Sequence, residues 1–505
     1  MPLGEQLRAA AARHPQKPAL IFDQRTWTYG ELDAATDRLA AGLIADGIRT
    51  GDRVALHFTN GVEIVTAYYA CFKIGAIAVP LNTRMIGPEL VYVLNHCSAR
   101  LYLGQPALFA ALAPLRAELQ TIERYFVSGD ASAFAGVEPF AALDADRTPA
   151  LEAPEVADTA VAAILYTSGT TARPKGVTHT HATLRHLAQA GLDVADGRPD
   201  DVAGVALPTC HIFGLSVVIA TLMAGNAALM IPRFDPVLVL AQLRDHGVTI
   251  FGGLPVMLNA LVHCPGAASY DLGKLRACFA GGDAVPTEVH KRFKDTFGVD
   301  VTEACGMTEV QPYACNPLYG RGKTGSIGLP APRTSLRIVD AFDRDVLPGE
   351  EGEVLVQSPA MMVGYWNDPD ATAATIRDGW LRTGDLARVD GDGYYWFVGR
   401  KKEIIIRGGS NISPLEVEEA LYQHPAVREV GVVGGPDETF GEIVLAFVSL
   451  KTGAAVSEED LKAFVSTRIA AYKVPAQITF VPDLPKGLTG KVQRKALKEL
   501  VARSG

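Results

Sequence analysis

The stretch Tyr166-Thr-Ser-Gly-Thr-Thr-Ala-Arg-Pro-Lys-Gly176 concentrates small hydroxyls, glycine and lysine more than any other part of the chain. It follows an apolar run at residues 161–165 that is typical of a buried strand. A strand that opens into such a loop presents backbone amides and hydroxyls to phosphate oxygens, and Lys175 adds a point charge. The loop is not a Walker A motif, because Pro174 stands where that motif has its second glycine and Gly176 stands where it has Ser or Thr. The stretch therefore predicts a phosphate site, although taken alone it also suits an ordinary polar turn.

Length and composition describe a globular chain without the marks of a nucleic-acid or membrane partner. The 505 residues exceed a single hydrophobic core, so two or more domains are expected. The 47 basic and 56 acidic residues give a net charge of −9 with no basic block, which argues against nucleic acid or an anionic membrane as a partner. No apolar run approaches the length of a membrane span, so stable membrane insertion is not expected. Seven cysteines without a CxxC pair indicate reduced thiols. The start of the chain does not resemble a signal peptide, so a cytoplasmic protein is expected.

Strand and helix patterns alternate along the first part of the chain. Thr28 and Glu31 form a capping box that begins an amphipathic helix. Strand patterns at residues 54–58 and 76–80 flank a helical pattern at residues 67–72. This alternation predicts an α/β layer with a mainly parallel sheet.

The last hundred or so residues follow a different pattern. A charged run at residues 401–403, a strand at residues 404–406 and a helix that carries Glu416 mark the start of a small α+β domain. The predicted fold class is therefore α/β, with a large N-terminal domain of several subdomains at residues 1–400. The small domain, predicted to be mobile, takes residues 401–505.

Beyond the phosphate loop, the sequence offers weaker signals for a site. Residues 179–192 read as a helix, and His211 precedes a second, apolar one. A lone histidine in such a place is more often a satisfied structural group. Two predicted strands end in the paired glycines Gly252-Gly253 and Gly281-Gly282, which allow a ligand to approach the backbone but equally suit tight turns.

Three polar motifs complete the candidates. Ala304-Cys-Gly-Met-Thr-Glu309 places a hydroxyl beside a carboxylate, a pair that can hold Mg²⁺ against a phosphate oxygen. Asp385 ends the motif Trp380-Leu-Arg-Thr-Gly-Asp385 in a predicted turn, where it can accept two ribose hydroxyls or satisfy its own backbone. Lys491 is expected in an exposed loop that contains glycine, where a lysine is usually solvated.

In this order, the motifs resemble those of the adenylate-forming superfamily, which contains acyl-CoA synthetases, adenylation domains of peptide synthetases and beetle luciferases. The resemblance covers nearly the whole chain and rests on the phosphate loop, Gly306-Met-Thr-Glu309, Thr383-Gly-Asp385, Gly399-Arg400 and Gly490-Lys491. The form of Gly408-Gly-Ser-Asn-Ile-Ser-Pro414 is similar to that of bacterial fatty- or aryl-acyl-CoA synthetases.

The resemblance implies a reaction in two halves. A carboxylate attacks the α-phosphate of ATP to give acyl-AMP and pyrophosphate, and the thiol of coenzyme A then displaces AMP. The implied cofactors are ATP, Mg²⁺ and coenzyme A, and the implied partners are these and a small carboxylic acid.

The resemblance also implies roles for individual residues. Lys491 would bridge the carboxylate and the α-phosphate, and the other implied catalytic residues are Thr308, Glu309 and His211. The remaining implied ATP-binding residues are Thr167, Ser168, Gly169, Thr170, Thr171, Lys175, Gly281, Gly282, Asp283, Ala304, Cys305, Gly306, Met307, Asp385 and Arg400. Glu309 and Thr167 would hold Mg²⁺. Lys402 would be the hinge between the domains, and Gly408 and Gly409 would line the coenzyme A tunnel in a second conformation.

Two positions depart from the family's pattern. Ala172 replaces a glycine that is usual in the phosphate loop. Cys305 stands where relatives commonly have an aromatic residue against the adenine, and the loss of such a stacking contact weakens binding by about 1 kcal/mol. Asp283 would offset this loss by accepting a hydrogen bond from the adenine amino group.

The implied pocket restricts the class of acid substrate but does not identify the acid. The implied acyl pocket is bounded by His211, Phe213, Phe251, Gly252, Gly253, Leu254, Gly281 and Met307. No arginine or lysine is among these residues, which disfavours a dicarboxylic acid. The paired glycines leave room, so a medium or longer alkyl chain or an aromatic ring is favoured over acetate.

Two alternative functions stay open. In the first alternative, the enzyme stops at the acyl-adenylate or delivers the acyl group to a carrier protein. Two features argue against it, because no carrier domain is expected after Lys491 and the Gly408-Gly409 motif favours free coenzyme A. A non-catalytic nucleotide-binding relative would lack Lys491, Glu309 or Asp385, and all three are present. The oligomeric state, a homodimer included, is not decided by the sequence.

Overall fold

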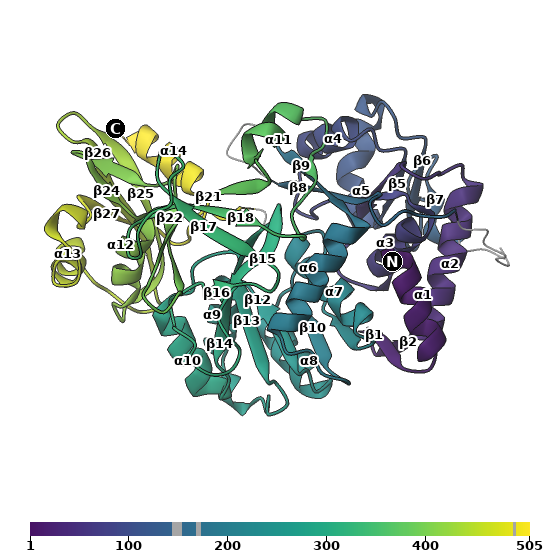
Figure 1. Cartoon of the computed structure of the whole chain (residues 1–505), viewed down its shortest axis with the longest axis horizontal. Coiled ribbons are helices and arrows are strands. Elements are labelled where there is room, and N and C mark those ends of the chain that lie inside the picture. Colours follow the sequence, from purple (N-terminus) through teal and green to yellow (C-terminus); the bar gives the residue numbers. More distant parts are fainter. Residues whose placement is uncertain (144–153, 168–172, 488–490, 505) are drawn as a thin grey trace.

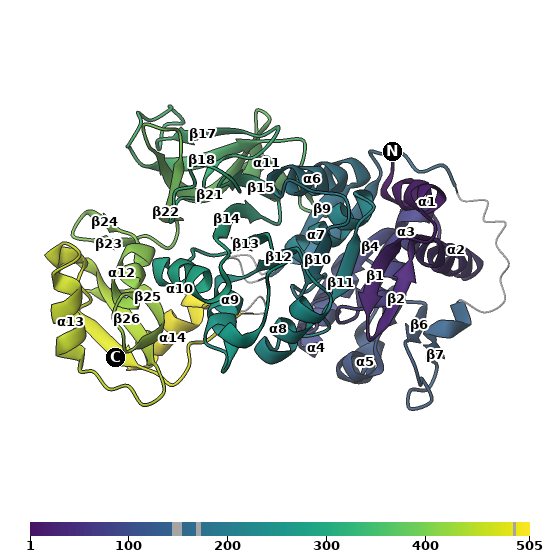
Figure 2. The ribbon, with the colours of Figure 1, turned by 90° about the horizontal axis from the view of Figure 1, so that it is seen from below.

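A computed structural model describes residues 1–143, 154–167, 173–487 and 491–504 (Figure 1). Two α/β sheets lie side by side in the N-terminal part, a smaller β-sheet packs on them, and an α+β domain forms the end of the molecule opposite the N-terminus (Figures 1 and 2). This arrangement confirms the predicted fold class. In the described part of the chain, no helix is both long enough and apolar enough to cross a membrane.

The described residues form an eight-stranded sheet that contains the strands before and after the phosphate loop in the sequence. Its order is β19 (Gly364–Tyr365), β9 (Lys175–Thr180), β8 (Val161–Thr167), β4 (Ile77–Pro80), β3 (Arg53–His57), β5 (Leu101–Gly104), β6 (Arg124–Val127) and β7 (Glu138–Pro139). The helices along this stretch are α2 (Tyr29–Ala45), α3 (Val62–Ile74), α4 (Gly87–His96) and α5 (Pro106–Leu112). The predicted capping box is confirmed, since the Thr28 side chain accepts from the Glu31 amide and the Glu31 carboxylate accepts from the Thr28 amide.

The sequence prediction of a helix from His179 is wrong at its start. Residues up to Thr180 form β9, which runs antiparallel to β8 and pairs Thr167 with Lys175. The helix α6 (His181–Val194) begins only after Thr180, whose hydroxyl caps it. The β-branched residues Val177 and Thr178 favour the strand. The described residues on either side of the phosphate loop therefore form the base of a hairpin.

A nine-stranded sheet is formed by the described residues beside the first. Its order is β16 (Leu329–Pro330), β15 (Val310–Cys315), β14 (Val301–Met307), β13 (Ala277–Gly281), β12 (Ile250–Gly253), β10 (Val202–Val205), β11 (Ala227–Met230), β1 (Pro18–Phe22) and β2 (Arg25–Thr28). The accompanying helices are α1 (Leu3–Arg13), α7 (Ile212–Met223), α8 (Pro236–Asp245), α9 (Pro255–Val262) and α10 (Thr287–Phe297). Because β12, β13 and β14 are parallel, their glycine-rich carboxyl ends lie at one edge, where ligands bind in open α/β sheets.

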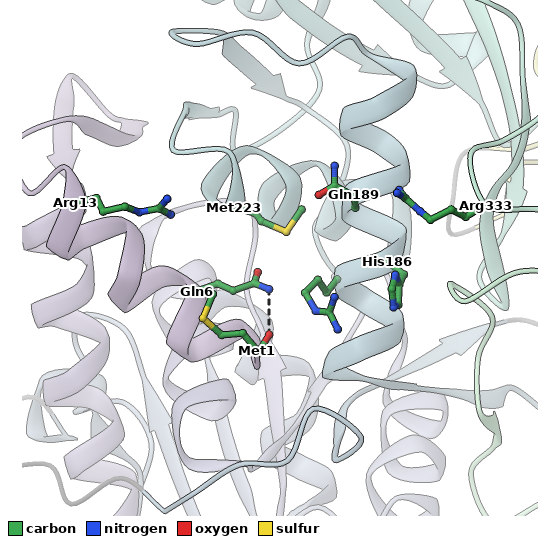
Figure 3. A pocket seen from close by; sticks show the side chains of 8 residues that line it. Met1, Gln6, Arg13, His186, Gln189, Met223 and Arg333 are labelled. Atoms are coloured by element: carbon green, nitrogen blue, oxygen red, sulfur yellow. Dashed lines mark hydrogen bonds between the residues drawn. The ribbon is translucent and has the colours of Figure 1, made fainter.

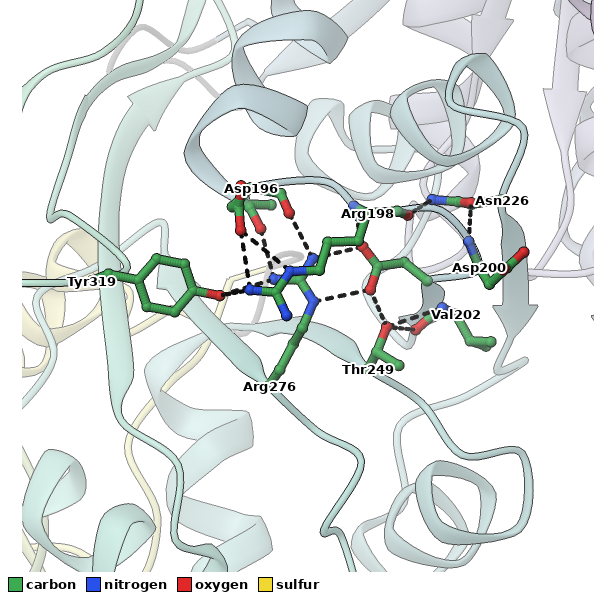
Figure 4. A network of polar contacts seen from close by, with 10 residues as sticks. Asp196, Arg198, Asp200, Val202, Asn226, Thr249, Arg276 and Tyr319 are labelled. Atoms are coloured by element: carbon green, nitrogen blue, oxygen red, sulfur yellow. Dashed lines mark hydrogen bonds and ion pairs between the residues drawn. The ribbon is translucent and has the colours of Figure 1, made fainter.

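The opposite edge of this sheet is fixed by a network of polar contacts (Figure 4). Arg276, just before β13, donates two hydrogen bonds to the Asp201 carboxylate, at 3.0 and 2.6 Å, and others to the carbonyls of Ala195 and Asp196. Thr249, just before β12, donates to the same carboxylate at 2.7 Å. The starts of three neighbouring strands are thus tied together, which holds their other ends in register.

The third sheet corrects the prediction for Asp385. Its described strands are β17 (Ser335–Val339), β18 (Gly352–Gln357), β21 (Trp380–Val389), β20 (Ile376–Arg377) and β22 (Tyr395–Arg400), with α11 (Pro369–Thr375) alongside. Asp385 lies within β21 and not in a turn. The preceding Gly384, which suggested the turn, has φ of 70° and lies where the pairing with β18 is irregular, so it marks a bulge inside the strand.

The C-terminal domain packs helices on a small sheet. Its described strands are β24 (Ser410–Ile412), β23 (Ile405–Arg407), β26 (Gly441–Leu450), β25 (Val427–Asp437) and β27 (Gln477–Phe480), and its helices are α12 (Pro414–Tyr422), α13 (Glu458–Ser466) and α14 (Arg494–Ser504). Val417 and Leu421 of α12 and Val430 of β25 are buried in its own core. The turn between β22 and β23 lies where the sequence predicts the domain boundary.

Candidate active site

A cavity of about 1170 Å³ lies between the N-terminal part and the C-terminal domain. It brings together nine of the candidate residues: Leu254, Gly282, Asp283, Ala304, Cys305, Gly306, Asp385, Arg400 and Lys491. Residues of the C-terminal domain, among them Glu418 and Arg494, form the facing wall. The shape of the cavity therefore depends on the position of the C-terminal domain relative to the N-terminal part.

A second cavity, of about 450 Å³, lies between α1, α6 and α7 (Figure 3). It is lined by Met1, Gln6, Arg13, Arg185, His186, Gln189, Met223 and Arg333. None of these is a candidate residue, and the Gln6 amide is bonded to the Met1 carbonyl at 3.1 Å. The candidate residues that line one of these two cavities are therefore all in the larger one.

Lys491 is not the solvated loop residue that its sequence setting suggests. Its side chain is half-buried, and its Cε and Nζ lie 3.5 and 3.8 Å from the position that a methyl group on Gly282 would occupy. Gly282 has φ of 89°, which favours glycine, and Leu254 lies 3.0 Å from the same position. The structure therefore places the lysine against the paired glycines at the end of β13.

Asp385 and Arg400 are opposite each other on β21 and β22. Asp385 is 2% exposed, its Oδ1 lies 3.0 Å from Arg400 Nε, and its Oδ2 accepts from the Tyr313 hydroxyl at 2.8 Å. Cys305 donates to that hydroxyl at 2.9 Å, and burial raises the pKa of the thiol to about 12. The four side chains form a chain of contacts that orients the Asp385 carboxylate. Cys305 lines the cavity, but its sulfur is engaged with Tyr313, a residue that the sequence did not single out.

Tyr365 connects two other candidates. Its hydroxyl donates to Glu309 Oε1 at 2.7 Å, and Lys175 Nζ lies 4.7 Å from the centre of its ring. Glu309 is 8% exposed, in the turn between β14 and β15. Since one carboxylate oxygen is held by the tyrosine, the other is available to a cation.

Thr308 is positioned by a residue that the sequence analysis assigned to a helix. His179 Nε2 donates to the Thr308 carbonyl at 2.8 Å, and Nδ1 lies 3.1 Å from the Thr183 hydroxyl. Burial lowers the pKa of His179 to about 4, so the ring is neutral. This contact ties the β14–β15 turn to the strand that follows the phosphate loop.

The donors at this end of the site fit a hard cation. Glu309 offers a carboxylate, and Thr167, at the end of β8, pairs with Lys175 on β9. Among the described residues, no group of three or more His, Cys, Asp or Glu side chains could hold a metal ion. Mg²⁺ is commonly held by one or two carboxylates together with substrate phosphates, so the residues fit a magnesium ion that arrives with a nucleotide.

The structure brings some of the predicted acyl-pocket residues together, but it places the Phe251 side chain elsewhere. The Phe213 ring lies 3.4 Å from the methyl positions of Gly252 and Gly281, and a methyl group on Gly281 would also lie 2.6 Å from the Ala304 carbonyl oxygen. Phe251 is fully buried in the core on the other face of β12, because successive side chains of a strand point to opposite faces. Gly253 faces the same core, 3.2 Å from Leu258. Met307 is half-buried against an apolar cluster.

The remaining candidates lie away from the cavity or outside the described residues. Lys402 is exposed in the turn between β22 and β23, and Gly408 and Gly409, with φ of 56° and 83°, form the tight turn between β23 and β24. Neither glycine lines the cavity. Residues 168–172, with Ser168, Gly169, Thr170, Thr171 and the substituted Ala172, lie outside the described part of the chain.

Comparisons with known proteins identify the family to which the chain belongs. Residues 7–366 match the family of AMP-binding enzymes, and residues 416–491 match the AMP-binding enzyme C-terminal domain. The chain is 35% identical to a long-chain-fatty-acid–CoA ligase of Bacillus subtilis, over 98% of this chain and 93% of that protein. It is also 35% identical to an indoleacetate–CoA ligase of Aromatoleum aromaticum, over 100% and 99%.

A solved structure is similar to the whole chain. The crystal structure of the anthranilate CoA ligase AuaEII in complex with anthranoyl-AMP superimposes with a TM-score of 0.94 at 30% identity, covering 100% of this chain and 98% of that one. The chain therefore belongs to the adenylate-forming superfamily, in its acyl-CoA synthetase branch, and is an acid–thiol ligase that uses ATP, Mg²⁺ and coenzyme A.

Proposed function

We propose that the enzyme activates a medium- or long-chain fatty acid or an aromatic acid and transfers it to coenzyme A. The observation that carries this proposal is the packing of the Phe213 ring against Gly252 and Gly281, which gives the acyl pocket an apolar wall. None of the residues assigned to the pocket is an arginine or lysine that could pair with a second carboxylate. The relatives that act on long-chain fatty acids and on indoleacetate support the same range. We further propose that the enzyme works in the cytoplasm, in keeping with its unpaired cysteines.

The side chains of this chain provide the electrostatic part of the first half-reaction. The attacking carboxylate and the α-phosphate are both anions, so their approach must be stabilised by fixed cations. We assign the contact with both groups to Lys491, which lies beside Gly282, and the contact with the terminal phosphates to Lys175, which lies over the Tyr365 ring. When it is bound, Mg²⁺ adds positive charge at the phosphates, with Glu309 as its protein ligand.

Other residues of the same cavity hold the nucleoside. The Asp385 carboxylate, oriented by Tyr313 and Arg400, accepts the ribose hydroxyls. Asp283 is exposed to the cavity, where it can accept from the adenine amino group. Holding the base and sugar rigidly leaves the α-phosphate in a fixed place relative to Lys491.

A panel of acids tests the substrate class. Octanoate, palmitate, benzoate, indoleacetate and malonate are each incubated with ATP and Mg²⁺, and pyrophosphate release is measured without a thiol. We expect release with the alkyl or the aromatic acids and none with malonate. Release with malonate alone would contradict the proposed pocket.

The identity of the thiol that accepts the acyl group is tested by adding a thiol to the same mixture. Coenzyme A is compared with a phosphopantetheinylated acyl carrier protein at equal thiol concentration, and thioester is measured. We expect acyl-CoA to form faster. Preferential transfer to the carrier protein would instead support the alternative in which the enzyme delivers its acyl-adenylate to a carrier.

Tyr365 offers a test of the magnesium end of the site. Tyr365→Phe keeps the ring beside Lys175 but removes the hydrogen bond to Glu309. A hydrogen bond to a charged group contributes roughly 1.5–3 kcal/mol, so the Mg²⁺ concentration for half-maximal pyrophosphate release should rise about tenfold or more. The KM for ATP at saturating Mg²⁺ should change little.

The matched variant is Tyr365→Leu, which also removes the ring from Lys175. It should raise the KM for ATP in addition to the Mg²⁺ requirement. If Tyr365→Phe lowers kcat without a change in the Mg²⁺ requirement, the hydroxyl does not act through Glu309.

A further inference from the structure

Two buried asparagines hold the segment before α7. Asn60 donates to the carbonyls of Val205, Leu207 and Ile231, at 3.2, 2.9 and 3.2 Å, and accepts from the Thr209 amide at 2.9 Å. It lies between β3 and α3, so the eight-stranded sheet fixes the backbone of a loop that belongs to the nine-stranded one. Asn82, which follows β4, reaches the same loop at His211.

The orientation of the Asn82 amide follows from its two contacts. Its Oδ1 accepts from the Arg84 amide at 2.8 Å, and its Nδ2 lies 2.8 Å from His211 Nε2. Turning the amide over would place Nδ2 against the Arg84 N–H, two donors facing each other. Nδ2 therefore donates to His211, and Nε2 must accept. A neutral histidine that accepts at Nε2 carries its proton on Nδ1.

The surroundings of His211 favour the neutral ring. The charged groups of the described residues that act on it are both cations, Lys491 from the C-terminal domain and Arg84 from the loop after β4. Burial, Lys491 and Arg84 together lower the pKa of His211 to about 4. The neighbouring Cys210 thiol is also uncharged, because burial raises its pKa to about 12.

The proton on Nδ1 is left without a partner in the described part of the chain. The ring stands at the N-terminus of α7, two residues before Phe213, the residue proposed to form the wall of the acyl pocket, and it is close enough to Lys491 for the ammonium group to lower its pKa. A free donor at this place can reach an oxygen of the acyl group.

We propose that Asn82 is a positioning residue that holds His211 with its proton on Nδ1, so that the ring donates a hydrogen bond to the acyl group and cannot accept the proton of the thiol. In this arrangement His211 orients the carboxylate for attack and contacts the carbonyl oxygen in the thioester step. The inference rests on the proposed function for the identity of the acceptor, but the state of the ring does not depend on it.

The state of the ring can be measured directly in the free protein. Nitrogen-15 spectra of histidine-labelled enzyme distinguish Nδ1–H, Nε2–H and doubly protonated rings, and His211→Gln assigns the signal among the eleven histidines. We expect the neutral Nδ1–H form at neutral pH. A ring with its proton on Nε2, or one doubly protonated at neutral pH, would overturn the proposal, whereas a protein that releases no pyrophosphate with any acid would contradict only the proposed function.

Asn82→Asp gives a second signature that a merely structural role would not produce. The new carboxylate keeps the acceptor for the Arg84 amide, but it forces a proton onto His211 Nε2 and raises the pKa of the ring. Below that raised pKa, Nδ1 is also protonated and still donates. Above it, the ring loses the Nδ1 proton, so kcat/KM for the acid should fall about 10- to 100-fold as the pH rises through the new pKa.

Two comparisons complete the test. The parent enzyme should show no such loss between about pH 6 and about pH 9, because its ring stays neutral throughout. Asn82→Ala removes the partner without adding a charge and should lower kcat/KM by a similar factor at every pH. A uniform loss in Asn82→Asp as well would show that Asn82 serves only the fold; should that variant not fold, the spectrum of the parent protein still decides the matter.

Discussion

Replacing Lys491 by alanine is expected to lower the rate of acyl-adenylate formation by a factor on the order of 10²–10³, the usual cost of removing one preorganised contact to a developing charge. The side chain lies against Gly282 at the cavity and acts electrostatically on His211, and in the proposed mechanism it contacts both the acid and the nucleotide. Pyrophosphate release in a single turnover measures this step. The fold should be unaffected, because the lysine is not part of a hydrophobic core.

The second half-reaction provides the control within the same variant. Thioester formation from supplied acyl-adenylate should be nearly normal in Lys491→Ala, because the lysine acts in the first step only. Lys495→Ala removes a neighbouring lysine that is exposed and does not line the cavity, and both steps should survive it. Equal losses of the two steps in Lys491→Ala would make the lysine a structural residue.

The second large effect is expected at the turn between β22 and β23. We propose that one arrangement cannot serve both half-reactions, because Lys491 and the thiol would need the same face of the nucleotide pocket. Gly408 and Gly409, implied to line the thiol's path, are exposed and away from the cavity here. Rotation of the C-terminal domain at Lys402 would exchange the two faces.

Proline at position 402 should therefore block the rotation of the C-terminal domain but leave the chemistry of the first half-reaction intact. In the described part of the chain the Lys402 amide donates no hydrogen bond, so proline removes none, but it fixes φ near −65° and prevents a large rotation. We expect Lys402→Pro to keep substantial acyl-adenylate formation and to lose most thioester formation.

The matched variant for the hinge is Lys402→Ala, which removes the charge but leaves the backbone free to rotate. It should keep both steps. Parallel losses of acyl-adenylate and thioester formation in Lys402→Pro would contradict a pivot at this position. They would instead indicate that Lys402 belongs to a solvated linker, in which a substitution affects both steps alike.

Local signals in the sequence predicted much of the fold and the order of the candidate motifs. The capping box at Thr28 and the glycine-ended strands depend on neighbours in the chain, and they were predicted correctly. The position of Asp385 was not, because Gly384 marks a bulge as easily as a turn. Phe251 was assigned to the pocket because residue type alone does not reveal which face of a strand a side chain occupies.

Local sequence signals could not reveal the residues that position the side chains of the site. Each of these residues contacts a residue far away in the chain through a hydrogen bond: Tyr313, Tyr365, His179 and Asn82. Nothing in their own neighbourhoods distinguishes a tyrosine or asparagine that positions a partner from one that merely packs. Their partners become visible only when the two α/β sheets and the third sheet are placed together.

The most direct test of the two-step account is a single-turnover experiment on the parent enzyme with ATP labelled at the α-phosphate. Without coenzyme A, the account predicts that label accumulates as acyl-AMP in an amount that depends on the acid and matches the pyrophosphate released. Addition of coenzyme A should then convert that acyl-AMP into AMP and acyl-CoA at a rate no slower than turnover. AMP and pyrophosphate that form only when coenzyme A is present, with no acyl-AMP at any time, would contradict it.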